Sequence, residues 1–130
     1  MQPESLDKID TLAKIGASLV GVQIEAARIG PREIAGDPYL LGYCFGMFET
    51  MAQMAGLDQY SEGSEMMGAA FGKVVDQADA GPALFRVALD MKVDADFNEG
   101  SDEGGKEVIA WFADASAMPT GIARRAASRQ

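Results

Sequence analysis

The sequence predicts an α+β fold, with three N-terminal helices followed by an antiparallel β-hairpin. Two observations predict it: apolar residues recur every three or four positions in the first part of the chain, and every second position after residue 84. The expected helices span about 4–29, 38–60 and 65–78, and the expected strands span about 84–97 and 106–114. A single domain over 1–117 is expected to be followed by a tail, 118–130, that is flexible or a short helix.

The first helix carries two adjoining apolar series, and Leu12 and Leu19 belong to one of them. An apolar face this wide needs two neighbours, within the chain or across a dimer. Gly30 and Pro31 predict its end, since glycine is common just after a helix and proline cannot continue one.

The second helix is expected to begin at Asp37 and Pro38, an N-cap followed by proline at the first helical position. Its small and polar residues recur in steps of four and three, which places them on one stripe. They are Gly42, Gly46, Glu49, Gln53 and Gly56. The Gly-x-x-x-Gly spacing is typical of membrane helix pairs, but Glu49 and Gln53 would lie near the middle of a span, at high cost. The stripe is therefore interpreted as a packing seam or a solvent-facing edge.

The hairpin prediction depends on residues 85–97, where apolar side chains alternate with polar or small ones. Residues 107–113 are aromatic and β-branched in part, as in a strand, and the Gly-rich segment 98–105 is interpreted as the connecting loop. A lone hairpin is marginally stable, so pairing with the hairpin of a second copy is expected. The alternative is an all-α bundle, because residues 84–95 also fit a helical repeat.

Composition excludes several function classes. The chain has 130 residues, 20 acidic against 11 basic, and a net charge of −9, which disfavours nucleic acid and anionic membranes as partners. The absence of histidine removes Ser-His-Asp catalysis and His-ligated zinc. Cys44 is the single cysteine, and the N-terminus has no signal-peptide pattern, so a cytoplasmic location is predicted. No cofactor is predicted.

A calcium loop is the one metal candidate, formed by Asp94, Asp96 and Asn98. An EF-hand loop needs glycine at its sixth position and glutamate at its twelfth, and this segment has Glu99 and Gly105 there. The segment is therefore interpreted as a solvated acidic face, with no metal predicted.

The favoured function is that of a structural or interaction module, a homo-oligomer expected to be a dimer, rather than an enzyme. No catalytic residue is predicted. Its expected interface residues are Gly42, Gly46, Glu49, Gln53, Leu12 and Leu19. The alternative is a binder of a small apolar ligand in a methionine-rich pocket, lined by Met47, Met51, Met54, Phe85 and Trp111. A carboxylate enzyme that pairs Glu49 with a strand aspartate is the least favoured.

Overall fold

The protein is all-α, and the prediction of an α+β fold with a β-hairpin is wrong. The computed structural model describes residues 3–128, which contain seven α-helices, two short 3₁₀-helices and no strand. The elements are α1 (Pro3–Ala27), α2 (Arg32–Gly36), α3 (Pro38–Met54), α4 (Glu62–Val74), η1 (Ala78–Ala80), α5 (Gly81–Asp90), η2 (Met91–Val93), α6 (Ala95–Ala113) and α7 (Gly121–Ser128). The all-α bundle, the stated alternative, fits.

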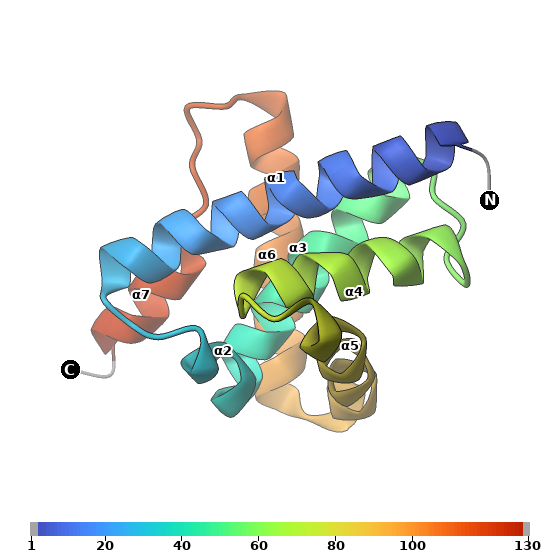
Figure 1. Cartoon of the computed structure of the whole chain (residues 1–130). Helices are drawn as coiled ribbons and strands as arrows, with labels where there is room; N and C mark the ends of the chain where they lie inside the picture. The colour runs from blue at the N-terminus through green and yellow to red at the C-terminus, as the bar shows by residue number, and fades with distance from the viewer. Residues whose placement is uncertain (1–2, 129–130) are drawn as a thin grey trace.

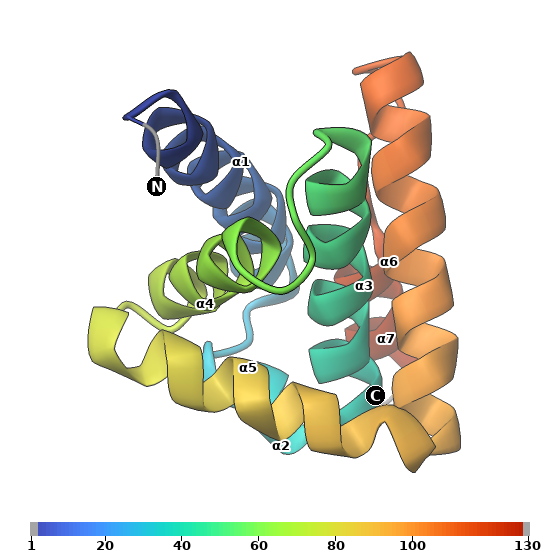
Figure 2. The same cartoon turned by 90° about the vertical axis from the view of Figure 1, so that its right-hand side faces the viewer.

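Helix α3 lies at the centre of the bundle. Figure 2 shows α1 and α4 on one side of it, α6 alongside it on the other, and α5 crossing the base. Every residue from 40 to 48 is buried, so this part of α3 lies wholly in the core. Helix α7 returns to pack against α1 (Figure 1), so part of the expected tail is helical.

Helices α3 and α6 run parallel and pack through glycines on both helices (Figure 2). A Cβ atom added at Gly42 or Gly46 would fall closer than 3.0 Å to a backbone carbonyl of α6. A Cβ atom at Gly100 or Gly104 would do the same to a carbonyl of α3. The carbonyls are those of Phe97, Ser101, Tyr39 and Tyr43, respectively. Two Gly-x-x-x-Gly segments therefore allow the two backbones to touch, and we call this contact the glycine seam.

The segment predicted as the first strand, 84–97, instead forms most of α5, all of η2 and the start of α6. In a half-buried strand Val87 and Leu89 would share the buried face, and Ala88 would face water. The structure has the opposite: Ala88 is fully buried, whereas Val87 and Leu89 are 49% and 40% exposed. The small Ala88 side chain packs against the bundle, and this contact favours a helix over the strand that the alternating pattern predicts.

The predicted loop 98–105 and strand 106–114 together form most of α6. Glycines in a helix interior cost stability in isolation, which is why this stretch was interpreted as a loop. Here Gly100 and Gly104 are buried against α3, and close packing of the helices outweighs the weak intrinsic propensity. Asp94 is the N-cap of this helix, and its Oδ1 accepts a hydrogen bond of 3.0 Å from the Phe97 amide.

Three helices end in the same C-terminal motif, in which a residue with positive φ follows the last turn. These residues are Arg28 after α1, Gly56 after α3 and Asp76 after α4, with φ of 58°, 73° and 55°. The next amide in each case bonds back five residues, as in a Schellman motif. The predicted cap of α1 at Gly30 is therefore two residues too late, and Arg28 takes the left-handed position.

Candidate functional site

A cavity of about 190 Å³ opens between α3, α4 and the C-terminal half of α5. Its floor consists of buried apolar side chains, Phe45 and Ala52 from α3 and Met67 from α4. Phe85 and Leu89 of α5 form a wall and are more exposed. The cavity is therefore apolar at its base and open to solvent at its mouth, the usual arrangement of a small-molecule site. We call it the α3–α4–α5 cavity.

The Phe45 ring at the floor of the cavity packs between two other aromatic rings. Its ring is stacked on that of Phe85, with centroids 6.2 Å apart and planes 11° apart. It also meets the ring of Phe97 at 5.5 Å in a tilted arrangement. These contacts fix the position of Phe45, so the floor is held in place before any ligand enters.

Two side chains of opposite charge line the mouth, together with polar residues. The Lys92 Nζ atom lies 5.1 Å from the centre of the Phe45 ring, in a cation–π contact. Glu49 also lines the cavity, is partly exposed, and forms no hydrogen bond or ion pair with any described residue. Gln53 and the exposed Tyr60 complete this rim. The rim can therefore bind the polar end of a ligand whose apolar part fills the base.

The five residues predicted to bind a ligand do not lie together. Phe85 lines the cavity, but Met47 and Met51 are buried in the general core, and Met54 is 52% exposed. Trp111 is half-buried on α6, where its ring meets that of Phe112 edge-on. The methionine that reaches the cavity is Met67.

The residues predicted to form an interface divide between three places. Gly42 and Gly46 lie in the glycine seam, covered by α6 of the same chain. Leu19 is buried in the core, and Leu12 is half-buried against it. The last two, Glu49 and Gln53, line the cavity mouth. The stripe on α3 is thus a packing seam in its first half and a cavity wall in its second.

The acidic segment has structural contacts of its own. Asp94 caps α6, and the Asn98 Nδ2 atom donates a 2.8 Å hydrogen bond to the Lys92 carbonyl. Asp96 is exposed in the first turn of α6. Among the described residues, no group of three or more acidic or cysteine side chains is arranged to hold a metal ion.

The five residues predicted to bind a ligand leave out several that line the cavity, among them Phe45, Met67, Leu89 and Lys92. Phe45 and Met67 resemble ordinary core residues in a helical repeat, and nothing local marks them out. Leu89 and Lys92 were placed on opposite faces of a strand, so their convergence depended on assigning a helix there. A helical interpretation of 84–95 would have brought Phe85, Leu89 and Lys92 onto one face, three and four residues apart.

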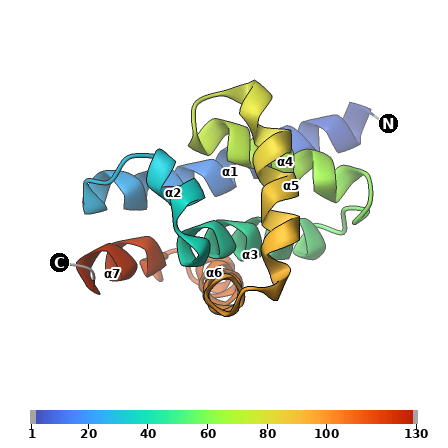
Figure 3. The same cartoon turned by 90° about the horizontal axis from the view of Figure 1, so that it is seen from below.

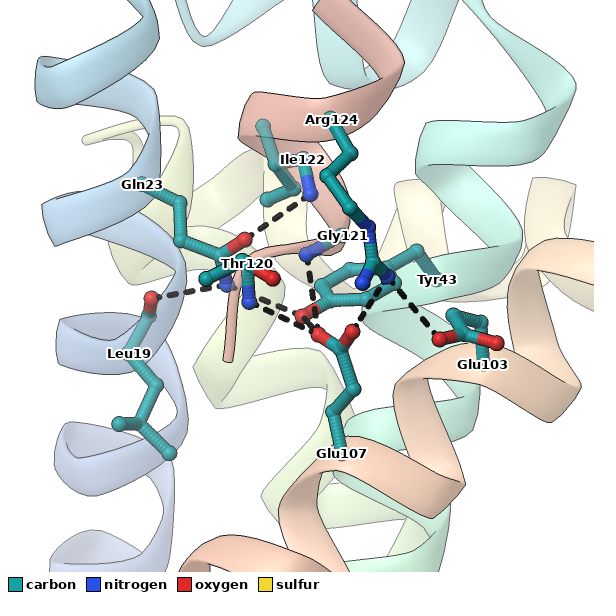
Figure 4. Close-up of polar contacts among 9 residues, drawn as sticks. All are labelled: Leu19, Gln23, Tyr43, Glu103, Glu107, Thr120, Gly121, Ile122 and Arg124. Atoms are coloured by element: carbon teal, nitrogen blue, oxygen red, sulfur yellow. Dashed lines mark hydrogen bonds and ion pairs between the residues drawn. The ribbon is translucent and has the colours of Figure 1, made fainter. Parts of the chain in front are cut away.

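A second polar cluster joins α1, α3, α6 and α7 (Figure 4). One carboxylate oxygen of Glu107 accepts three hydrogen bonds: from the Tyr43 hydroxyl at 2.6 Å and from the Thr120 and Gly121 amides at 2.9 Å each. The other oxygen lies 2.5 Å from the Arg124 guanidinium. Glu107 therefore caps the first turn of α7 from another helix.

Gln23 completes this cap from α1. Its Oε1 atom accepts a 2.9 Å hydrogen bond from the Ile122 amide, and its Nε2 atom donates to the Tyr43 hydroxyl at 3.0 Å (Figure 4). Gln23 is 4% exposed, and every buried side-chain polar atom among the described residues has a partner. The cluster therefore satisfies the start of α7 and leaves no open position for a substrate.

Burial and hydrogen bonding shift two pKa values in this cluster. Partial burial alone would raise the pKa of Glu107, but the hydrogen bonds from Tyr43, Gly121 and Thr120, together with Arg124, outweigh it and lower the pKa. Burial, and the hydrogen bond to Glu107, raise the pKa of Tyr43 far above its ordinary value. Glu107 is therefore held ionised and Tyr43 neutral, as a structural pair requires.

No protein-family model matches the chain, and neither a curated protein nor a solved structure does. What the chain binds therefore has to be inferred from its own cavities. Among the described residues, no helix is both long enough and apolar enough to cross a membrane.

Proposed function

We propose that the protein binds a small apolar ligand in the α3–α4–α5 cavity. The observation that carries the proposal is the cavity's buried apolar floor, which includes Phe45 and Met67, beneath an open mouth. Its volume is about 190 Å³, and an enclosed apolar cavity of roughly 150 Å³ is enough to bind benzene. The proposed ligand is thus one aromatic ring or a short acyl chain.

The rim is proposed to select ligands with a polar end. The carboxylate of Glu49 forms no hydrogen bond or ion pair with a described residue, so it can accept a hydrogen bond from a ligand without breaking one. The Lys92 ammonium group, which has the opposite charge, can donate a hydrogen bond to an acceptor atom of the ligand. A ligand with a hydroxyl, amine or ring N–H at one end of an apolar body fits this pairing.

Self-association remains a separate prediction with less support than before. Two of its three grounds have changed, since no hairpin exists to seek a partner strand and Gly42 and Gly46 are covered within the chain. Light scattering on the purified protein measures the oligomeric state directly.

The cytoplasmic location also stays a proposal. A fully buried, unpaired Cys44 accords with it.

Binding is tested by thermal unfolding and calorimetry with indole, benzyl alcohol and hexylamine. A ligand that binds the native state raises its stability by about 2.7 kcal/mol at a hundred times its Kd. Native mass spectrometry of freshly purified protein checks in parallel for a bound mass that is lost on denaturation.

A matched pair of variants on α5 makes the test specific. Leu89→Trp places a large ring in the cavity and is expected to abolish binding. Val87→Trp makes a comparable change two residues away, at a partly exposed side chain that does not line this cavity, and is expected to leave binding unchanged. Equal affinity in Leu89→Trp and the parent, or no binding of any probe together with no co-purified mass, would contradict the proposal.

A further inference from the structure

The end of α1, helix α2 and helix α7 come together on the left of Figure 1 and of Figure 3. A second cavity, of about 530 Å³, is lined by residues of these helices, and we call it the arginine cleft. It shares no lining residue with the α3–α4–α5 cavity. Three arginines line it, Arg28, Arg32 and Arg125, beside apolar side chains that include Ile29 and Leu40. This gathering is notable because the chain as a whole has a net charge of −9.

The arginines of α7 are already paired with carboxylates. The Nε atom of Arg125 lies 3.2 Å from a carboxylate oxygen of Asp37. Arg124, outside the cleft, pairs with both Glu103 and Glu107. Their guanidinium groups are therefore largely committed to the fold.

Arg28 and Arg32 differ, because neither forms an ion pair or a hydrogen bond through its side chain with any described residue. Both are exposed, and the two acidic side chains that also line the cleft, Glu33 and Asp37, have hydrogen-bond partners of their own. The Glu33 carboxylate accepts a 3.1 Å hydrogen bond from the Gly30 amide, and Asp37 accepts one of 3.0 Å from the Tyr39 amide. The N–H donors of two guanidinium groups are thus available to a ligand within one cleft, in a chain where acidic residues outnumber basic ones.

The backbone of Arg28 adds an independent observation. Its φ of 58° lies in the left-handed region, where glycine is the least strained residue and Asp or Asn is tolerated. Gly56 and Asp76 hold the equivalent positions after α3 and α4, and Arg28 is the one described residue with positive φ that is neither glycine nor Asx. The conformation does not favour an arginine, which accords with a use for its side chain.

We propose that the arginine cleft binds a small organic dianion, a phosphomonoester or a dicarboxylate, through Arg28 and Arg32. Planar guanidinium groups match both anions with paired, charge-assisted hydrogen bonds. Ile29 and Leu40 give the cleft an apolar wall for a short carbon body. A volume of about 530 Å³ lies within the usual range for small-molecule sites. A polyanion would be repelled more strongly by the net negative charge of the chain than a small dianion, because it has more negative charges.

The test is calorimetric titration of the full chain at low ionic strength with glycerol 3-phosphate, glutarate and inorganic phosphate. We expect saturable binding of glycerol 3-phosphate or glutarate, and comparing the two identifies the preferred anion. Acetate, a monoanion, should bind more weakly than glutarate. Absence of saturable binding for all three dianions at millimolar concentration would overturn the proposal.

Single substitutions assign the binding to this cleft. Arg28→Gly and Arg32→Gln are each expected to weaken binding about tenfold, the effect of one charged hydrogen bond. Arg28→Gly suits the left-handed backbone, so this variant is expected to stay folded, and thermal unfolding checks that it does. Arg86→Gln, at an exposed arginine outside the cleft, is the control and should not change the Kd. An affinity unchanged by both cleft variants, or reduced equally by Arg86→Gln, would refute the assignment.

Discussion

The glycine seam predicts that Gly46→Ala and Gly21→Ala change stability in opposite directions. At Gly46 the new Cβ would lie closer than 3.0 Å to the Ser101 carbonyl, and ordinary contacts begin at 3.4 Å. Both atoms belong to helix backbones, so no side-chain rotation relieves the clash and α3 must move away from α6. Overpacking of this kind costs about 1–3 kcal/mol, even though alanine is the better helix former.

Gly21 provides the matched control. It is exposed on α1, and a Cβ atom there would meet nothing within 4 Å. Gly21→Ala should therefore express only the helix propensity of alanine, a gain of about 1 kcal/mol. For a chain of this size, 1 kcal/mol corresponds to roughly 3–5 °C in Tm.

Urea unfolding followed by circular dichroism measures both variants. The midpoint should fall for Gly46→Ala and rise for Gly21→Ala, with the slope m unchanged in each. Gly104→Ala approaches the seam from the other helix, and combining it with Gly46→Ala should cost less than the sum, since the first change already separates the helices. A Gly46→Ala variant as stable as Gly21→Ala would show that the backbones do not touch as described.

Three further outcomes are expected. Because the pKa of Glu107 is lowered in the folded state, its contribution to stability is present above the ordinary pKa of about 4.5 and is lost as pH falls through the folded value. Glu107→Gln should therefore lower the unfolding free energy by about 1–2 kcal/mol at neutral pH. Denaturant titrations at several pH values should show that the difference between the variant and the parent becomes smaller in acid. Gly56→Ala should lower the unfolding free energy by about 1 kcal/mol, because φ of 73° lies in the left-handed region, where a Cβ atom adds strain. Burial raises the pKa of Cys44, so a thiol reagent should modify it only after unfolding, and rapid labelling of the native protein would be inconsistent with its position.

The first half of the fold followed from periodicity, whereas the second half did not. Helices near 4–29 and 38–60 showed long apolar repeats, and the Asp37–Pro38 start agrees with an Asp37 side chain that accepts from the Tyr39 amide. Residues 84–97 contained two competing periods, and only the burial of Ala88 decides between them. A sequence cannot show which of two faces a neighbouring helix will cover.

Helix α6 was missed for a physical reason. Its glycines look like loop residues when each is judged by its own propensity, but their use depends on a partner backbone 50 or more positions away. The signal was present, since Gly100 and Gly104 repeat the spacing of Gly42 and Gly46. Two such segments in one chain indicate a pair of helices that pack together, whereas either one alone indicates nothing specific.

The glycine seam also explains why Glu49 lies at a cavity rather than in a contact. Gly42 and Gly46 bring α6 close to the first turns of α3, and there the two backbones leave no space between them. One turn later the same stripe carries Glu49 and then Gln53, and these side chains face the opening between α4 and α5. A charged residue on an otherwise apolar central helix is tolerated because this is where α3 meets solvent. Helix α6 still lies against α3 at this level, where a Cβ atom at Gly105 would meet the Thr50 hydroxyl, so the polar rim belongs to the side of α3 that turns away from α6.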